Sequence, residues 1–278
     1  MDKTSDARRD ERVLDAHTHL TEEVFDSDLE AVIHRAVGCG VDRFLSCGTS
    51  EADWDRVSSL ARAECRVLPA FGLHPWFVAG RSPQWKDRLV GLLSSIPSSV
   101  GEIGLDGAME NTPEEAIEVF AEQLELAERF AVPASIHCVH AWGPLLEAIR
   151  PFAGEVPMLI HAFGGSVEIL RQLEQLGCYF SFGCALLDPK RKRPRAAVKA
   201  VRLDRLLLES DAPTLPPPKE FRPPWMQLDA HGEARNEPAI VPTVLETIAE
   251  LRGISGEELA SATDENGRRF CGDRLYAW

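Results

Sequence analysis

The stretch VLDAHTHL, residues 13–20, begins with a short apolar run and carries two histidines two positions apart. In an extended strand, residues i and i+2 point to the same face, so His17 and His19 can bind one metal ion together. A lone histidine is more often a core or surface residue, but a pair with this spacing after an apolar run favours a metal site. Asp15, one alternation earlier, is expected to be structural or to hydrogen-bond a ligand from behind.

Short apolar runs of this kind recur along the chain, and most are separated by about 25 to 35 residues, the interval that a βα unit requires. They predict eight strands, at 13–14, 43–47, 67–73, 100–105, 133–138, 157–160, 178–183 and 206–209. A (β/α)8 barrel typically needs about 250 residues, and the chain has 278. We therefore expect a single α/β domain with TIM-barrel architecture over 13–271, between an N-terminal tail, 1–12, and a C-terminal tail, 272–278.

The segments between these runs carry helix signals. Thr112, followed by Pro113 and two glutamates, combines an N-cap with proline at the first helical position and a capping box. Gly177 and Gly253 each follow an amphipathic stretch and are expected where two helices end. Residues 255–258, SGEE, form a second capping box, which predicts a last helix.

Two stretches interrupt this alternation. Residues 188–195, DPKRKRPR, are basic, follow the seventh strand and are expected to form a loop. The proline-rich segment 213–224 follows the eighth strand. Loops that follow barrel strands lie on the face where the chemistry of this architecture takes place, so both should overhang the site. The basic loop either contacts substrate or is only a solvated turn.

The composition, with 44% hydrophobic and 27% charged residues, is that of a soluble globular protein. The sequence contains neither an apolar run of about 18 residues, which could span a membrane, nor the apolar core of a secretory signal. We therefore expect a cytoplasmic protein that has no membrane partner. Seven cysteines without C-x-x-C spacing argue against a disulfide framework and a structural zinc finger. The net charge of −14 disfavours a non-specific nucleic-acid coat but does not exclude a phosphate substrate at a metal site.

Glu102 interrupts an apolar strand between two glycines. A buried, unpaired carboxylate is strongly destabilising, so a metal or another cation must lie near it. Because its two oxygens can bridge two cations, Glu102 is our candidate bridge, and a salt bridge to an arginine inside the barrel is the alternative. Asp106, past the end of the same strand, is expected either to support a ligand or to cap a helix.

Further histidines follow later apolar runs. His137 and His161 each close a strand and begin a loop, and with the first pair they form a set that an ordinary core does not explain. His74 ends the third strand, where its imidazole either donates to a substrate oxygen or is a neutral structural group. His140 lies further into the fifth loop and is expected to face substrate or to be structural.

Glu209 and Asp211 place two carboxylates at the end of the eighth strand. A carboxylate beside a metal ion can ligate the ion, orient a water and accept its proton, and we assign this catalytic role to Asp211. Glu209 lies two residues earlier, on the same face of the strand and deeper in the barrel. It is expected to hydrogen-bond a ligand histidine. The sequence has no G-x-S-x-G elbow or Walker loop that would offer other hydrolytic chemistry.

With these residues in place, the chain resembles the TatD-type metal-dependent hydrolases of the amidohydrolase superfamily. The resemblance rests on DAHTHL at 15–20, GLHPW at 72–76, GEIGLD at 101–106, Ile136-His137, HAFGGS at 161–166 in place of the usual HCFSGS, ESDAP at 209–213 in place of ETDAP, the turn 236–238 and the segment 266–270. It implies a (β/α)8 barrel that holds two divalent ions. The implied ligands are His17, His19, Glu102 and Asp211 for the first ion, and Glu102, His137 and His161 for the second. His74 would then lie near the substrate.

Two features of the sequence bear on this resemblance. Many binuclear amidohydrolases use a carboxylated lysine as bridge, but the lysines here lie at 3, 86, 190, 192, 199 and 219, none at a strand end. TatD relatives commonly carry an arginine two residues after the fifth-strand histidine, where this chain has Val139. If that arginine grips a phosphate, then His140, Arg193 or Arg222 must replace it, or the substrate differs.

The leading prediction is hydrolysis of a phosphodiester in DNA by a water that two divalent ions activate, with Asp211 positioning the water or taking its proton. Imidazole and carboxylate ligands accommodate zinc, manganese, magnesium or iron. A hydrolase of a small ester, lactone, amide or aminoacyl-tRNA linkage would use the same centre, so the substrate is a small molecule or a nucleic acid. A non-catalytic binding module on the same barrel is the third hypothesis, and no obligate protein partner is evident.

Overall fold

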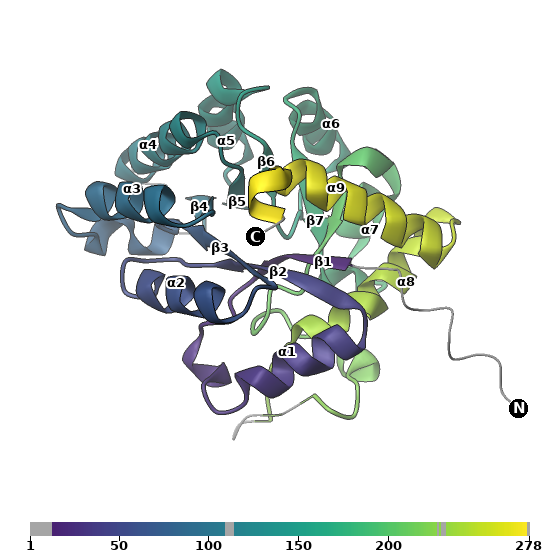
Figure 1. Cartoon of the computed structure of the whole chain (residues 1–278). Coiled ribbons are helices and arrows are strands. Elements are labelled where there is room, and N and C mark those ends of the chain that lie inside the picture. Colours follow the sequence, from purple (N-terminus) through teal and green to yellow (C-terminus); the bar gives the residue numbers. More distant parts are fainter. Residues whose placement is uncertain (1–12, 109–113, 227, 229–231, 277–278) are drawn as a thin grey trace, which may run out of the picture.

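The computed structural model describes residues 13–108, 114–226, 228 and 232–276. Its eight parallel strands form a closed barrel in sequence order (Figure 1). β8 pairs back onto β1 and closes the barrel. The strands are β1 Val13–Thr18, β2 Val41–Cys47, β3 Val67–Phe71, β4 Ser99–Asp106, β5 Ala134–Val139, β6 Met158–Ile160, β7 Tyr179–Phe182 and β8 Leu206–Leu208. The predicted single-domain (β/α)8 barrel is confirmed.

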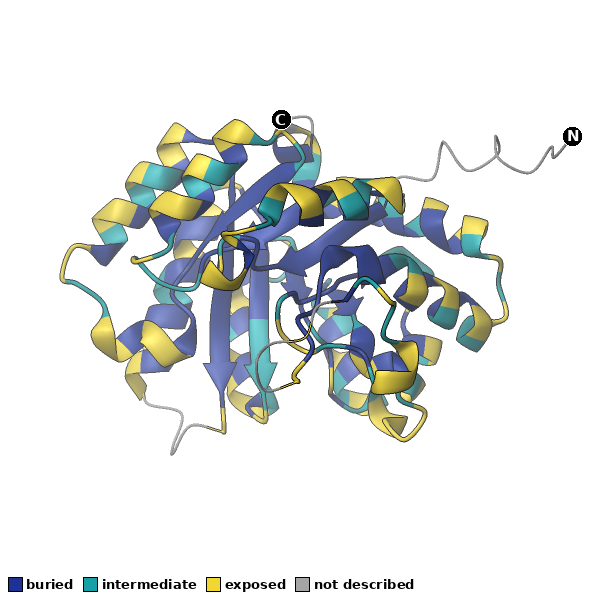
Figure 2. Ribbon diagram, turned by 90° about the horizontal axis from the view of Figure 1, so that it is seen from below, coloured by how far each residue is buried: buried dark blue, intermediate teal, exposed yellow. Residues whose placement is uncertain are grey.

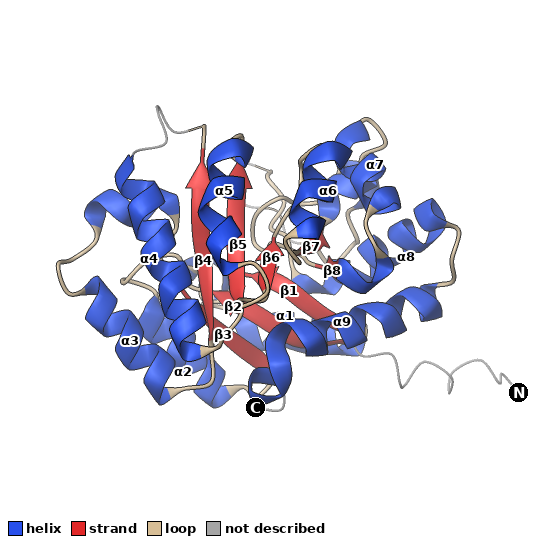
Figure 3. Ribbon diagram, turned by 90° about the horizontal axis from the view of Figure 1, so that it is seen from above, coloured by secondary structure: helices blue, strands red, loops and turns tan. Residues whose placement is uncertain are grey.

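Helices enclose the barrel on its outer side (Figure 3). They are α1 Leu29–Gly38, α2 Trp54–Ala63, α3 Trp85–Ser95, α4 Glu114–Phe130, α5 Trp142–Ile149, α6 Val167–Gln175, α7 Lys192–Ala200, α8 Val241–Arg252 and α9 Gly256–Tyr276. Within the described residues, no helix is both long enough and apolar enough to cross a membrane.

Helix ends follow the predicted signals where the structure describes them. Gly177, with φ 84°, lies just beyond α6, and Gly253, with φ 68°, ends α8. The backbone N–H of Glu258 donates to Oγ of Ser255 at 3.0 Å, which caps the start of α9. The predicted N-cap and proline at 112–113 lie outside the described residues, and α4 is described from Glu114.

Apolar side chains fill the inside of the barrel and the layer between strands and helices. Figure 2 shows strands that are buried along most of their length and helices whose outer faces are exposed. The end of α9 packs on the barrel, where Leu275 and Tyr276 join a buried cluster with Leu14 of β1. The expected C-terminal tail from residue 272 is therefore wrong for residues 272–276, because buried apolar side chains hold them against the barrel. The expected N-terminal tail lies outside the described residues.

The basic segment after β7 is not a loop throughout, which corrects the expectation. A 3-10 turn, Cys184–Leu187, follows β7, and α7 already begins at Lys192. Pro194 occupies the first turn of α7, where its missing N–H costs nothing because that group has no partner inside a helix. The segment thus divides into a short turn and the first turn of α7.

Among the strand ends that differ from expectation, those of β3 and β5 position site residues. β3 ends at Phe71, so His74 lies beyond the strand and begins the 3-10 helix Pro75–Gly80 as its N-cap. β5 continues to Val139, because its residues pair with the long strand β4, and His137 lies within β5 opposite Gly104.

Candidate metal centre

Six side chains selected from the sequence meet at the carboxyl end of the barrel. They are His17, His19, Glu102, His137, His161 and Asp211. They come from β1, β4 and β5 and from the residues just after β1, β6 and β8. Five are buried and His137 is partly buried. All except His17 line a cavity of about 580 Å³ that is open to the surface.

The two oxygens of Glu102 face two different pairs of histidines. Oε1 lies 2.8 Å from Nε2 of His161 and 2.9 Å from Nδ1 of His137. Oε2 lies 3.4 Å from Nε2 of both His17 and His19. No arginine or lysine among the described residues forms an ion pair with Glu102, so the alternative of a salt bridge inside the barrel does not hold there.

The nitrogens within each histidine pair are close together. In the first pair, the other nitrogen of each ring lies within hydrogen-bonding distance of a neighbouring residue. Nε2 of His17 lies 3.3 Å from Nε2 of His19, and Nδ1 of His137 lies 3.3 Å from Nε2 of His161. Nδ1 of His19 is 3.0 Å from the carbonyl oxygen of Cys47, which can only accept, so this nitrogen donates and leaves Nε2 facing Glu102. Nδ1 of His17 is 2.9 Å from Oγ of Ser135. Such fixed imidazoles are typical of metal ligands.

Asp211 joins the first pair of histidines. Its Oδ1 lies 3.5 Å from Nε2 of His19 and 4.0 Å from Nε2 of His17, and its Oδ2 accepts from Oγ1 of Thr214 at 3.1 Å. The residue has φ 54°, in the left-handed region that aspartate tolerates better than most residues. Its backbone N–H donates to the carbonyl of His17 at 2.9 Å. This bond fixes the carboxylate beside β1.

The cluster attracts positive charge. Burial acts against a charge on His19, but its hydrogen bond to Asp211 and the charges of Glu102 and Asp211 outweigh burial and raise its pKa to about 10. Burial also opposes a charge on His161, yet the charge of Glu102 raises its pKa to about 9. For Glu102, burial is again outweighed by the neighbouring imidazoles, which hold its pKa well below the usual value. A divalent cation would meet the same demand for positive charge.

Comparison with known proteins identifies the family. The sequence model of the family described as "TatD related DNase" matches residues 14–272. The chain belongs to this TatD family. It is therefore a metal-dependent hydrolase of the TatD type, as the motifs predicted. The chain is 33% identical over 263 residues to "Uncharacterized metal-dependent hydrolase YabD" of Bacillus subtilis, an alignment that covers 93% of this chain and 98% of the relative.

A second relative has a more specific description. The "3'-5' ssDNA/RNA exonuclease TatD" of Cronobacter turicensis is 32% identical over 266 residues, covering 93% of this chain and 97% of the relative. Among solved structures, the TatD homolog YJJV from Escherichia coli superposes with a TM-score of 0.85 at 27% identity, covering 94% of this chain and 98% of that one. A TatD-family hydrolase from Entamoeba histolytica, at 17% identity, superposes with a TM-score of 0.82 over 94% and 98% of the two chains and shares the fold.

His74 adds a hydrogen-bond donor to the TatD site. Nδ1 accepts from the backbone N–H of Trp76 at 3.2 Å, so Nε2 carries the proton and lies 3.5 Å from Oε1 of Glu102. Burial, together with the nearby histidines, lowers the pKa of His74 to about 3, against the charge of Glu102, so the ring is neutral. A neutral N–H donor thus faces the cavity.

The other expected site residues lie outside this cluster. His140 is exposed, has φ 52° and lines a neighbouring cavity. Glu209 lies behind His161, with Oε2 at 3.9 Å from Nδ1, too far for a hydrogen bond. Its oxygens instead accept from the backbone N–H of Ala162 at 2.7 Å and from Oγ of Ser181 at 2.6 Å. Asp15 accepts from the backbone and hydroxyl of Ser210 and is structural.

Sequence analysis missed two contributors, Ser135 and Trp76. Ser135 contacts a histidine 118 positions away in sequence, and no local pattern could reveal that. Trp76 lines the metal cavity and is 62% exposed. Its position after His74 and Pro75 in a loop that follows a strand was a usable signal. Asp106 was expected to support a ligand or cap a helix; as the last residue of β4 it contacts Trp76 and lies 3.5 Å from Nε2 of His137.

Proposed function

We propose that this TatD-family protein hydrolyses phosphodiester bonds of a nucleic-acid strand with two divalent metal ions. The proposal rests on the position of Glu102. Its two carboxylate oxygens each face a separate pair of histidines. A carboxylate placed in this way would suit a bridge between two cations.

The proposed ligand sets follow the two oxygens. His17, His19 and Asp211 gather near Oε2 of Glu102, and His137 and His161 gather near Oε1. Imidazole and carboxylate donors of this kind suit zinc, manganese and iron, and carboxylates suit magnesium as well. The donor set therefore fits divalent ions, whose identity the experiment below determines.

Divalent ions in such a site lower the pKa of a water toward about 7 and neutralise charge that develops on a phosphate. Asp211 is the proposed catalytic residue, because its carboxylate reaches the first histidine pair and faces the cavity, where it can orient a water and accept its proton. His74, neutral and with Nε2–H in the same cavity, is proposed to donate to a non-bridging phosphate oxygen. Glu209 is proposed to keep the loop that carries His161 in place through the N–H of Ala162.

The relatives support the substrate class, since those named as 3'-5' ssDNA/RNA exonucleases align over nearly the whole chain. A hydrolase of a small ester, lactone, amide or aminoacyl-tRNA linkage would use the same centre and is the competing candidate. A non-catalytic module is disfavoured because the proposed ligands belong to groups of side chains that could hold a metal ion.

The test is an assay of the purified protein, loaded in turn with Mg²⁺, Mn²⁺ or Zn²⁺, on two panels. One panel holds single-stranded DNA, RNA and bis(p-nitrophenyl) phosphate, and the other holds p-nitrophenyl esters, lactones and amides. We expect cleavage of the phosphodiesters that stops with EDTA. If esters or lactones are hydrolysed and the phosphodiesters are not, the proposal is overturned in favour of the competing candidate.

A further inference from the structure

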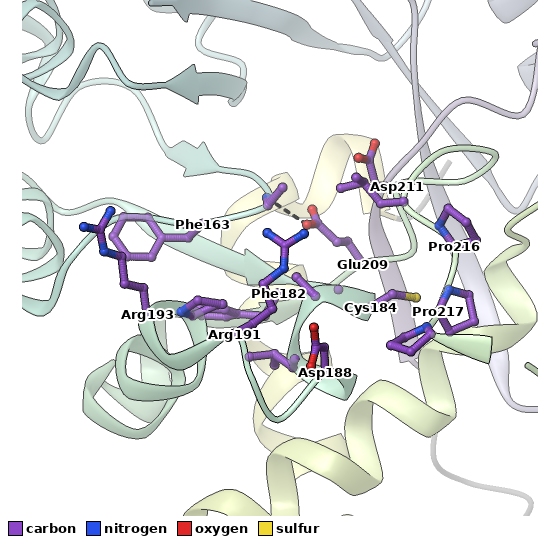
Figure 4. A pocket seen from close by; sticks show the side chains of 18 of the residues that line it. Phe163, Phe182, Cys184, Asp188, Arg191, Arg193, Glu209, Asp211, Pro216 and Pro217 are labelled. Carbon is purple, nitrogen blue, oxygen red and sulfur yellow. Dashed lines mark hydrogen bonds between the residues drawn. The ribbon is translucent and has the colours of Figure 1, made fainter. Parts of the chain in front are cut away.

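A second cavity, of about 820 Å³, adjoins the metal centre and shares Ala162, Asp211 and Leu215 with its lining. One wall is the basic segment after β7, and the other is the proline-rich segment after β8 (Figure 4). Phe182 and Cys184 also line it. The two cavities therefore adjoin each other, and Asp211 of the proposed metal site belongs to both linings.

The second cavity concentrates positive charge in an acidic protein. Its lining includes five cations, Lys190, Arg191, Lys192, Arg193 and Arg222, whereas the whole chain has a net charge of −14. Within the part of the chain that the structure describes, the four cations 190–193 form no ion pair with a carboxylate.

The acidic groups in the same cavity are already engaged. Oδ1 of Asp188 accepts from the backbone N–H of Lys190 at 2.8 Å and closes the turn. Both oxygens of Glu209 accept hydrogen bonds from the barrel, and Asp211 faces the histidines. The side chain of Arg195 turns away from the cavity lining to donate to the carbonyl of Leu186, which holds the turn in place. The remaining cations are thus held beside the cavity without a counter-charge.

The start of α7 adds further positive charge beside the cavity. Lys192 and Arg193 begin α7, and the first turn of that helix contains no acidic residue. A helix N-terminus carries partial positive charge and favours anions, so cations there repel the helix dipole. Both the side chains and the helix end would be stabilised by one bound anion.

We propose that this cavity binds a second phosphate of the substrate strand, next to the phosphodiester that is cleaved at the metal centre. The proposal rests on the proposed nuclease function and narrows its substrate to a strand with at least two phosphates. Figure 4 shows Arg191 extending toward Glu209 and Asp211, and Arg193 on the same wall of the cavity. Arg191 is therefore placed to contact the nearer phosphate, and Arg193 the outer part of the strand. Contacts of this kind read charge and not base sequence.

The first test compares substrates with one phosphate and with many. The metal-loaded Arg191→Ala/Arg193→Ala variant and the wild type are assayed on a thymidine decanucleotide and on bis(p-nitrophenyl) phosphate. We expect the ratio of kcat/KM for the strand to kcat/KM for the single diester to fall at least about tenfold, mainly through KM. Lys86→Ala/Lys199→Ala removes two cations outside the cavity and is the matched control. An unchanged ratio, or an equal fall in the control, overturns the proposal.

The second test locates the contact and does not depend on cleavage. Binding of decanucleotides in which one phosphate at a time is a neutral methylphosphonate is measured by fluorescence anisotropy in Ca²⁺. We expect the wild type to lose affinity at least about fivefold at one or two positions, and the double variant to be insensitive at those positions. Equal sensitivity in both proteins overturns the proposal. Failure of the nuclease function would appear differently, as a wild type that cleaves neither substrate in the first test.

Discussion

The indole N–H of Trp76 donates to Oδ2 of Asp106 at 2.7 Å, and the same oxygen lies 3.5 Å from Nε2 of His137. An exposed aromatic ring at the mouth of the metal cavity is thus hydrogen-bonded to a buried carboxylate that lies beside a proposed ligand. The hydrogen bond fixes the orientation of the ring while 62% of the residue stays accessible. A rigid, accessible ring beside a phosphodiester site suits stacking with a nucleobase.

Trp76→Ala is expected to weaken binding of a single-stranded oligonucleotide by about 1–3 kcal/mol, the usual contribution of one stacked base. Trp76→Phe keeps an aromatic face and is expected to lose less. Fluorescence anisotropy with a labelled oligonucleotide measures both variants. Wild-type affinity of Trp76→Ala would show that the ring does not contact substrate.

Asp211→Asn should lower kcat by about 10²–10⁴-fold, because the amide can neither accept the proton nor ligate as a carboxylate does. The fold should survive, since the amide oxygen can still accept from Oγ1 of Thr214. Circular dichroism and a phosphodiesterase assay measure the two effects. Asp55→Asn, whose side chain is 85% exposed, is the control. Full activity of Asp211→Asn would remove Asp211 from its proposed role.

Glu102→Gln should reduce the metal content at both positions, because one carboxylate oxygen faces each histidine pair. We expect two ions per wild-type chain and fewer than one in the variant, measured by mass spectrometry of metals after dialysis. Removal of metal by EDTA should abolish activity, and added Mn²⁺ or Zn²⁺ should restore it. Glu118→Gln, on the exposed face of α4, is the control. Two ions bound to Glu102→Gln would refute the bridge.

Metal binding should release protons. The pKa values of His19 and His161 are raised to about 10 and about 9, so both rings carry a proton at pH 7 before a metal binds. A metal needs the neutral ring, so its apparent affinity should rise with pH until the pH exceeds these values, and about two protons should leave per chain. Titration calorimetry in Tris and in HEPES measures this release. Equal heats in the two buffers would contradict it.

Glu209→Ala should destabilise the protein by about 1–3 kcal/mol, because it leaves the partly buried N–H of Ala162 and the buried hydroxyl of Ser181 without an acceptor. Glu209→Gln keeps an oxygen for one of these donors and should cost less. Urea unfolding of both variants measures the difference. Equal stability of Glu209→Ala and the wild type would show that the two hydrogen bonds contribute nothing.

Local sequence determined the barrel and most of the proposed metal site. Apolar runs at intervals suited to βα units indicated eight parallel strands, and parallel strands bring their carboxyl ends to one face. Histidines and carboxylates at those ends, such as His161 and Asp211, are therefore brought together by the barrel itself, independently of the loops. The family motifs added the ligand sets.

Tertiary structure alone decided how these groups face one another. Three features depend on contacts between distant parts of the chain. The two oxygens of Glu102 face different histidine pairs, Ser135 contacts His17, and Leu275 and Tyr276 are buried against the barrel. The basic segment shows the same limit. Its sequence indicated charge, but not that α7 begins within it or that it lines a cavity beside the metal centre. Periodicity reports what each residue does within its own strand or helix, whereas distances across the barrel arise only when strands and loops pack.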